Sequence, residues 1–594
     1  MRQRVPRLTV AAAVAASTFT GIAASAADRP SSQSVETPSV KPDWSKFDWA
    51  KLNAQALVEY TRPVRPGIPG KSPFLNVRRG HNQGHMYAPN FEFGTVPGAK
   101  HYRFTVAHWD ADKKVLGGKT WVFEAAEPWA SLAPVWTELP VCLMPGTGYS
   151  PNRPEKTGST WLRLTVEGLD GPDGKPVGKA RIGGAEVLEF RKSQPFQGPL
   201  EQPKTSLREA CMQAIRHALT DGLALQYTFY RDHRLPIEGP RGPALAKFQR
   251  IEQVFVAGGI WVADSMTFLA RESKDPDELA MALKTARNAA DTIINTANPA
   301  GWKYAGHANM VRNRGAHWAA YLAGEKTYEE WLADMHAKSA KGYSMMWDCR
   351  SGDPGLMLLD VYDVTKDAKY LEAAKRLAAA WRDTQLPSGT WPYRVNPVTG
   401  ESRGSDYPPA LTIWFLDRLA GQYGVRDYEQ TADRAFQWVL ENQVKPLDLR
   451  AHYHDARPGP RSSQGALAAS EIAMCLFNRA SRNPEYKAMG EEIIRWIEDW
   501  FIRWEADGTV LEQSRDRADV AFTAGGVVQA YVKAYEMTGN QLFLAKALRM
   551  ANRLMGDFVS KSGYGWAFYS GPRAAVCLLD AYPYLKKNNL PGGE

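Results

Sequence analysis

The sequence predicts an all-α (α/α)6 or (α/α)7 toroid preceded by a small all-β sandwich. Three observations predict this fold. A helical-hairpin pattern repeats through the C-terminal two-thirds of the chain. Each repeat joins an almost wholly apolar helix to an amphipathic one, as expected for inner and outer helices of a ring. Ahead of the repeats, short runs with alternating apolar residues are separated by turn sequences, which is typical of antiparallel strands.

The first 26 residues predict a signal peptide. Arg2, Arg4 and Arg7 precede an apolar run, and Ala24-Ser25-Ala26 supplies the small residues that a signal peptidase requires. An uncleaved anchor is the alternative interpretation. No later run is apolar for the roughly eighteen residues of a membrane span, so we expect a secreted or periplasmic protein without one.

Residues 27–80 are rich in Pro, Ser and Lys and lack helical periodicity, which predicts a linker or N-terminal arm. HNQGHMY (81–87) is interpreted as a turn of this linker. Strand-like runs fill 81–195, for example HYRFTVAHW (101–109) and STWLRLTVEGLD (159–170). The segments APNFEFGTVPGAKHYRFTV (88–106) and WLRLTVEGLDGPDG (161–174) resemble a fibronectin type III domain. That resemblance implies a β-sandwich that acts as a spacer or presents substrate.

Residues 200–590 are predicted to form the toroid. The clearest repeat pairs YDVTKDAKYLEAAKRLAAAW (362–381) with YEMTGNQLFLAKALRMANRL (535–554). Weaker copies begin near 421 and 478, which gives spacings of about 59, 57 and 57 residues. Six hairpins are expected between about 248 and 585. A possible seventh in 302–342 leaves the number open.

Composition favours an acidic polymer as the partner. The formal net charge is +9, and removing the signal peptide lowers it to about +6. Export argues against nucleic acid. Tryptophan occurs 20 times, and its rings either stack on sugars or fill the core. The five cysteines show no metal-ligand spacing, and Cys475 and Cys577 lie in apolar runs that predict core positions.

Loops that enter the inner helices should converge at one end of the ring, where helix N-termini favour anionic ligands. These loops are rich in Arg, His, Asp and aromatic residues. The residues expected to bind substrate there are Asn313, Arg314, Trp347, Arg350, Trp391, Tyr453, His454 and Arg515.

Two chemistries compete for this site. Hydrolysis of a glycosidic bond needs a pair of carboxyl groups, and Asp348, Asp353, Asp406 and Asp519 are the candidates, although each also suits a helix N-cap. Elimination from a uronic acid needs cations that neutralise the substrate carboxylate and a base that takes the adjacent proton. Arg–Tyr and His–Tyr clusters favour elimination.

In this architecture and loop chemistry, 206–585 resembles the (α/α)-toroid polysaccharide lyases of the alginate and glucuronan lyase type. The resemblance implies β-elimination on a uronic-acid polysaccharide. It suggests Tyr407 as base, Arg403 and Arg350 as carboxylate-binding residues, and His317 or His452 as neutraliser or second acid/base. The Asn-Asn-His string of one alginate lyase group is absent, and the nearest analogue is Asn313 with His317.

Other functions remain open at this point. A glycoside hydrolase, including one for unsaturated uronyl oligosaccharides, is the main alternative, followed by a non-catalytic glycan-binding protein and an epimerase. No cofactor is expected, nor a metal, because His452 and His454 are too few for a zinc site. The polymer, the endo or exo mode and the oligomeric state are left open by the sequence.

Overall fold

The computed structural model describes residues 47–65, 84–110, 115–142, 160–200, 207–220, 254–255, 258–309, 312–313, 325–341, 353–407, 409–449, 465–506, 508–510, 521–560, 576 and 579. The chain divides into two compact units, Met1–Val40 and Lys41–Glu594. All described residues belong to the second unit, so the predicted signal peptide lies outside them. None of the described helices is long and apolar enough to cross a membrane.

Helix α1 (Trp49–Tyr60) occupies part of the region predicted to be a linker. The Asp48 side chain begins the helix by accepting a hydrogen bond from the amide of Lys51. Leu52, Ala56 and Tyr60 are buried at i, i+4 and i+8, so one stripe of the helix packs into the protein. The expectation that 27–80 lacks regular structure is therefore wrong for this segment.

The first six strands form one sheet, and the other described strands form three two-stranded sheets: β7 (Val254–Phe255) with β8 (Arg312–Asn313), β9 (Trp391–Val395) with β10 (Ser402–Tyr407), and β11 (Ile502–Arg503) with β12 (Thr509–Val510). The order of the six-stranded sheet is β1-β6-β4-β2-β3, and β5 also pairs with β4. The bounds are Gly84–His85 (β1), His101–Asp110 (β2), Val115–Ala125 (β3), Thr160–Leu169 (β4), Pro176–Lys179 (β5) and Val187–Lys192 (β6). The described residues of this region contain no second sheet to complete the predicted sandwich. The prediction of a small β domain ahead of the helices is confirmed, and the prediction that it is a two-sheet sandwich is not.

Alternation within β2 and β4 gives the sheet one buried face and one outer face. Tyr102, Phe104 and Val106 on β2 and Leu162 and Leu164 on β4 are buried. Their neighbours along each strand are half-exposed, except Ala107, which is also buried.

Helices follow in pairs from α6 onward, as the repeats predict. The bounds are Gly258–Glu272 (α6) and Pro276–Asn295 (α7), Asp353–Thr365 (α10) and Ala368–Asp383 (α11), Ala410–Tyr423 (α12) and Glu429–Val439 (α13), Ala466–Asn478 (α14) and Glu485–Phe501 (α15), and Ala521–Thr538 (α16) and Gln541–Ser560 (α17). Two further helices are α3 (Leu207–Thr220) and α9 (Tyr328–Lys341), the latter in the stretch where a seventh hairpin was possible.

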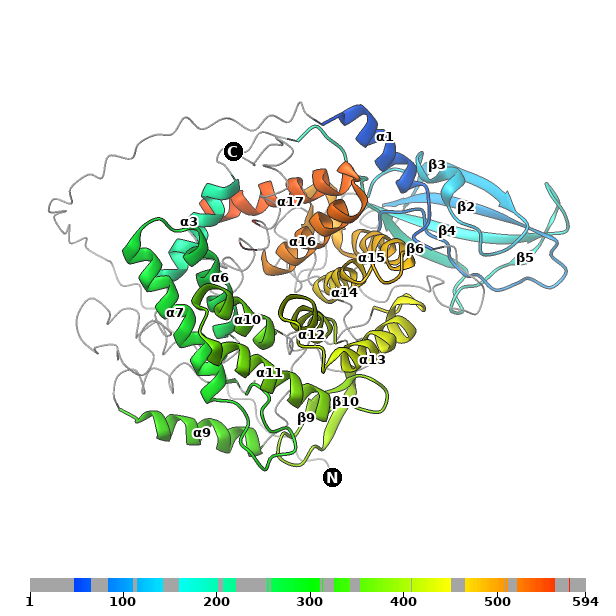
Figure 1. The fold of residues 1–594 in the computed structure, drawn as a ribbon. Helices are drawn as coiled ribbons and strands as arrows, with labels where there is room; N and C mark the ends of the chain where they lie inside the picture. Colours follow the sequence, from blue (N-terminus) through cyan, green and yellow to red (C-terminus); the bar gives the residue numbers. More distant parts are fainter. Residues whose placement is uncertain are drawn as a thin grey trace, which may run out of the picture. The chain divides into compact units, whose positions relative to one another are not determined.

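The first helices of the pairs contact one another in series, α6–α10–α12–α14–α16, and each second helix packs on its own partner (Figure 1). Helix α3 contacts both α6 and α17, which closes the series into a ring. In α14 every residue from Ala466 to Phe477 is buried, whereas the outer helix α13 buries one stripe only, from Thr431 to Val439. The predicted toroid with inner and outer helices is thus the architecture of this region.

The turn between helices has the same hydrogen bonds in the two clearest repeats. Thr365 Oγ1 donates to the Val361 carbonyl and accepts from the Asp367 amide. Thr538 Oγ1 donates to the Ala534 carbonyl and accepts from the Asn540 amide. The residue between has a positive φ in both turns, 54° at Lys366 and 69° at Gly539. This left-handed residue ends the first helix, and the following Asp or Asn caps the second.

Strand β1 joins the sheet to the helical ring. It pairs in parallel with β6, and the amides of Met86 and Tyr87 donate to Asp499 Oδ1 on α15 at 2.8 and 3.0 Å. His85 Nδ1 lies 3.5 Å from Asp499 Oδ2, and both side chains are buried. The interpretation of HNQGHMY as a linker turn is therefore wrong for its described residues, 84–87.

A buried charged cluster lies beside this junction. Glu498 accepts hydrogen bonds from the hydroxyls of Tyr87 and Tyr531, and Lys546 Nζ contacts its two oxygens at 2.8 and 2.9 Å. Glu59 of α1 reaches the same ammonium at 3.4 Å. The exposed fraction of Glu498 is 0% and that of Lys546 is 2%. Because every charge has a partner, the cluster ties α1 and β1 to α15, α16 and α17.

Candidate active site

Helices α12 and α14 run side by side in the same direction, and two contacts fix their register. Cys475 Sγ donates to the Ala410 carbonyl at 2.9 Å. One turn further along α14, Arg479 binds both oxygens of Asp417 at 2.6 and 2.7 Å. Residues on this stripe of α14 therefore lie level with α12 residues about 62 to 65 positions earlier in the sequence.

Glu471 occupies the same stripe of α14, four residues before Cys475. Four residues span about 6 Å along a helix axis, which brings Glu471 level with the residues just before Ala410, the first residue of α12. Its exposed fraction is 6%. It also contributes to the raised pKa of the Cys475 thiol, although burial is the main cause of that shift. A buried carboxylate therefore faces the N-terminus of an inner helix.

The β9–β10 hairpin ends at the same place. It consists of Trp391–Val395 (β9) and Ser402–Tyr407 (β10), and Tyr407 is followed after two prolines by α12. The end of β10, where Asp406 and Tyr407 stand in the sequence, thus leads directly into the start of α12, in the general region where the sequence predicted a site.

An irregularity in β10 separates the predicted catalytic residues of this hairpin. Arg403 pairs with Arg394 and Asp406 pairs with Pro392, so one extra residue lies between them. Tyr407 pairs with Trp391. The paired segments of β10 on the two sides of the irregularity therefore differ in register by one residue.

Trp391 was expected to stack on a sugar, but its packing is that of a core residue. Its exposed fraction is 0%, its indole N–H donates to the Trp381 carbonyl at 3.0 Å, and its ring meets that of Trp381 edge-on at 5.0 Å. No ring face is left for substrate, and the stacking role predicted for Trp391 is therefore wrong.

Asn313 lies in β8 (Arg312–Asn313), which pairs with β7 (Val254–Phe255). Strand β7 contacts α6, so Asn313 lies beside another inner helix. The remaining predicted site residues fall outside the part of the chain that the structure describes, and their roles stay predictions. They are Arg314, His317, Trp347, Arg350, His452, Tyr453, His454 and Arg515.

His307, which neighbours the predicted loops, has a structural role. Its Nε2 lies 3.0 Å from the Ala380 carbonyl and 2.9 Å from Thr384 Oγ1. Burial lowers its pKa from 6.5 to about 4, so the imidazole is neutral at neutral pH and joins the 301–309 segment to α11.

Metal-binding clusters of three or more His, Cys, Asp or Glu are absent from the described residues. Cys142, Cys211 and Cys475 are buried. The core position predicted for Cys475 is confirmed, whereas Cys577 lies outside the described residues.

Glu471 is the residue that the sequence analysis missed. It lies in the apolar run AASEIAMCLF (468–477), which has the composition of an inner helix. A single acidic residue in an otherwise apolar inner helix is itself a signal, because a charge is rarely buried without a purpose.

Comparisons with known proteins find similarity in structure but none in sequence. No protein-family model and no curated protein matches the sequence. Among solved structures, a family 76 glycoside hydrolase from a bovine Bacteroides thetaiotaomicron strain aligns over 83% of this chain and 99% of its own, with 11% identity and a TM-score of 0.40. An unsaturated glucuronyl hydrolase specific for heparin covers 64% and 98%, with 12% identity and a TM-score of 0.39.

A sugar epimerase from a ruminal bacterium covers 62% of this chain and 97% of its own, with 15% identity and a TM-score of 0.43. All three are similar to this chain at a level that carries no inference about activity or individual residues. The chemistry of this chain therefore has to be argued from its own side chains.

Proposed function

We propose that this chain is an exported enzyme that cleaves glycosidic bonds at the start of α12, by hydrolysis with Glu471 and Asp406. The proposal rests on one observation, the buried carboxylate of Glu471 level with the end of β10. Glycosidases need two carboxyl groups that flank the scissile bond, and Asp406 lies at the same helix start.

In this mechanism the two carboxyl groups divide the work. One of them, in its protonated form, donates a proton to the glycosidic oxygen as the bond to the sugar breaks. The other attacks the sugar carbon or removes a proton from the attacking water. Glu471, which is buried on an inner helix, is assigned the acid role, and Asp406 the other one.

Elimination from a uronic acid is the second candidate. The residues that favour it are Arg403 and Tyr407, which precede α12 on the same strand, together with the basic composition of the chain. A register shift of β10 separates the two residues. An acidic polysaccharide outside the cytoplasm is the proposed substrate for either chemistry.

The experiment incubates the mature protein with alginate, glucuronan, pectate, glycosaminoglycans and ulvan. Two products are followed together: new reducing ends, and ultraviolet absorbance from a C4–C5 double bond. Hydrolysis gives reducing ends without the absorbance, and elimination gives both. If neither product forms on any polymer, the proposed function is wrong.

Variants separate the two chemistries. Hydrolysis predicts that Glu471→Gln and Asp406→Asn each lower kcat by at least about a hundredfold, the usual contribution of acid–base catalysis. Tyr407→Phe should then retain activity. The matched control is Glu372→Gln, which changes a carboxylate that is 55% exposed on the outer helix α11. Elimination through Tyr407 predicts the reverse pattern.

A further inference from the structure

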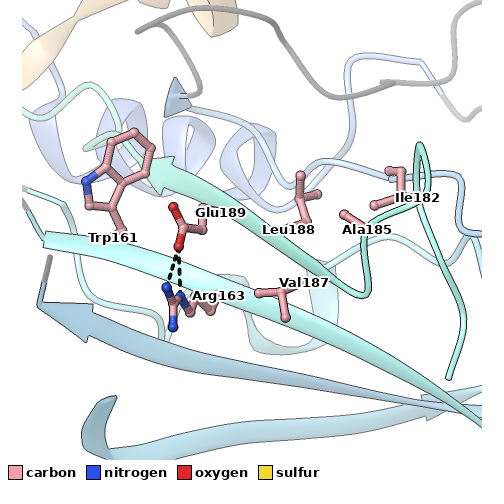
Figure 2. A pocket seen from close by; sticks show the side chains of 7 residues that line it. All are labelled: Trp161, Arg163, Ile182, Ala185, Val187, Leu188 and Glu189. Atoms are coloured by element: carbon pink, nitrogen blue, oxygen red, sulfur yellow. Dashed lines mark hydrogen bonds and ion pairs between the residues drawn. The ribbon is translucent and has the colours of Figure 1, made fainter. Parts of the chain in front are cut away.

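The six-stranded sheet carries a pocket whose lining residues are distant in sequence from the toroid loops. It has a volume of 420 Å³ and is lined by Trp161 and Arg163 on β4, Val187, Leu188 and Glu189 on β6, and the turn residues Ile182 and Ala185 (Figure 2). Sites for small molecules usually measure about 300–1000 Å³. The pocket is therefore large enough for a sugar residue and its neighbour.

An ion pair forms the polar wall of the pocket. Arg163 Nε and Nη2 both bind Glu189 Oε1, at 2.8 and 2.7 Å (Figure 2). Within the described residues Arg163 Nη1 donates no hydrogen bond and Glu189 Oε2 accepts none. Their exposed fractions are 29% and 42%. A donor and an acceptor thus lie next to each other at the pocket surface, in a pair with no net charge.

Aromatic rings hold this pair in place. The Arg163 guanidinium lies over the Trp109 ring, 3.3 Å from its centroid, and Arg191 lies over the Trp161 ring at 3.9 Å. The cross-strand register sets Trp109 opposite Trp161 and Arg163 opposite Glu189. Stacking restricts the guanidinium to one geometry, so its free donor is already oriented before a ligand binds.

Trp161 supplies the aromatic wall. It is half-exposed, and its indole N–H makes no hydrogen bond to any described residue. Figure 2 shows its ring beside the Glu189 carboxylate at one end of the pocket, with Val187, Ala185 and Ile182 toward the other end. An aromatic surface next to a neutral donor–acceptor pair is complementary to a sugar, whose C–H groups are apolar and whose hydroxyls both donate and accept.

We propose that this pocket is an accessory glycan-binding site, in which a pyranose contacts Trp161 and two neighbouring hydroxyls bind Arg163 Nη1 and Glu189 Oε2. The choice of a glycan as ligand rests on the proposed function, whereas the pocket is independent of it. The site holds the polymer on the sheet while the toroid acts on another part of it.

The test measures binding of an alginate hexasaccharide and of the neutral cellohexaose to the full mature chain by calorimetry. Glu471→Gln serves as the background so that neither ligand is consumed. Trp161→Ala should weaken the binding of at least one ligand tenfold or more. Glu189→Gln, which preserves the shape of the side chain, should weaken it about fivefold by removing one charged acceptor. The control Val122→Ala changes a residue that is 51% exposed on β3 and should leave binding unchanged.

Salt gives a second readout. Because the Arg163–Glu189 pair is neutral, affinity for the neutral hexasaccharide should change less than about twofold between low and high salt. Binding that survives in both pocket variants overturns the proposal, as does failure of the unchanged pocket to bind either ligand.

These outcomes are distinguishable from those of the proposed function. If Trp161→Ala abolishes hexasaccharide binding while Glu471→Gln still cleaves polymer, the accessory site stands and the proposed catalytic residue does not. If Glu471→Gln abolishes cleavage and Trp161→Ala leaves binding intact, the catalytic proposal stands and the accessory site does not.

Discussion

Lys546→Met should strongly destabilise the junction between the N-terminal elements and the helical ring. The substitution removes the ammonium that contacts both oxygens of Glu498, at 2.8 and 2.9 Å, and leaves that fully buried carboxylate without a counter-charge. Breaking a buried pair in this way costs about 3–5 kcal/mol. Tyr531 still donates to Glu498 at 2.6 Å, which favours the lower part of that range.

The double substitution Glu498→Gln with Lys546→Met should recover most of the loss, because no charge then stays buried alone. Native-state hydrogen exchange of α15 and α17 measures the local free energy of opening, which suits a chain too large for a single two-state transition. The control Lys533→Met breaks a pair at the α16 surface, 2.8 Å from Glu536, and should cost less than about 1 kcal/mol. Equal destabilisation in the single and double variants would refute this reasoning.

The same pair has a pH dependence. Burial by itself lowers the pKa of Lys546, but the carboxylates of Glu498 and Glu59 raise it above its ordinary value of 10.5. Because the folded-state pKa is the higher one, the stabilisation is fully present below 10.5 and is lost as the pH rises through the folded value. Opening of α17 should therefore become easier in strongly alkaline solution, and the double variant should lack this change.

Two further predictions concern stability. Burial lowers the pKa of His307 from 6.5 to about 4, so the unfolded chain takes up the proton first as the pH falls, and the free energy of unfolding should drop by about 3 kcal/mol between pH 6.5 and 4. Calorimetric scans of His307→Gln should show a flatter pH dependence, and an unchanged slope would contradict the structural role given to this histidine. Gly539→Ala should cost about 1 kcal/mol, because a φ of 69° strains an alanine although no atom lies within 4 Å of the new Cβ. Gly355→Ala places a Cβ 2.5 Å from the Phe415 ring and should cost more in denaturant unfolding, and a larger cost at Gly539 would show that backbone strain outweighs this steric overlap.

The helical ring could be predicted from sequence because its determinants are local. In the two clearest repeats the turn carries its own Thr and its own Asp or Asn cap, and these residues make the same bonds in both. The apolar and amphipathic helices then sort themselves into inner and outer positions. Repetition at a period near 57 residues makes the pattern visible even where single copies are weak.

The junction and the candidate site could not be predicted in the same way. The amides of Met86 and Tyr87 bind Asp499, more than 400 residues away, and no local pattern marks such a contact. The placement of Glu471 depends on the register of α14 against α12, which two side-chain contacts set. Trp391 gave a misleading signal because a tryptophan in a loop-like sequence looks the same whether it stacks on sugar or fills the core.

The most direct test of the central claim is the activity of Glu471→Gln on whichever polymer the unmodified protein cleaves. We expect kcat of Glu471→Gln to fall at least about a hundredfold while its melting temperature stays close to that of Glu372→Gln. The unmodified protein should release reducing ends without forming a product that absorbs in the ultraviolet. Undiminished turnover in Glu471→Gln would show that this buried carboxylate serves only the N-terminus of α12, and that the chemistry lies elsewhere in the chain.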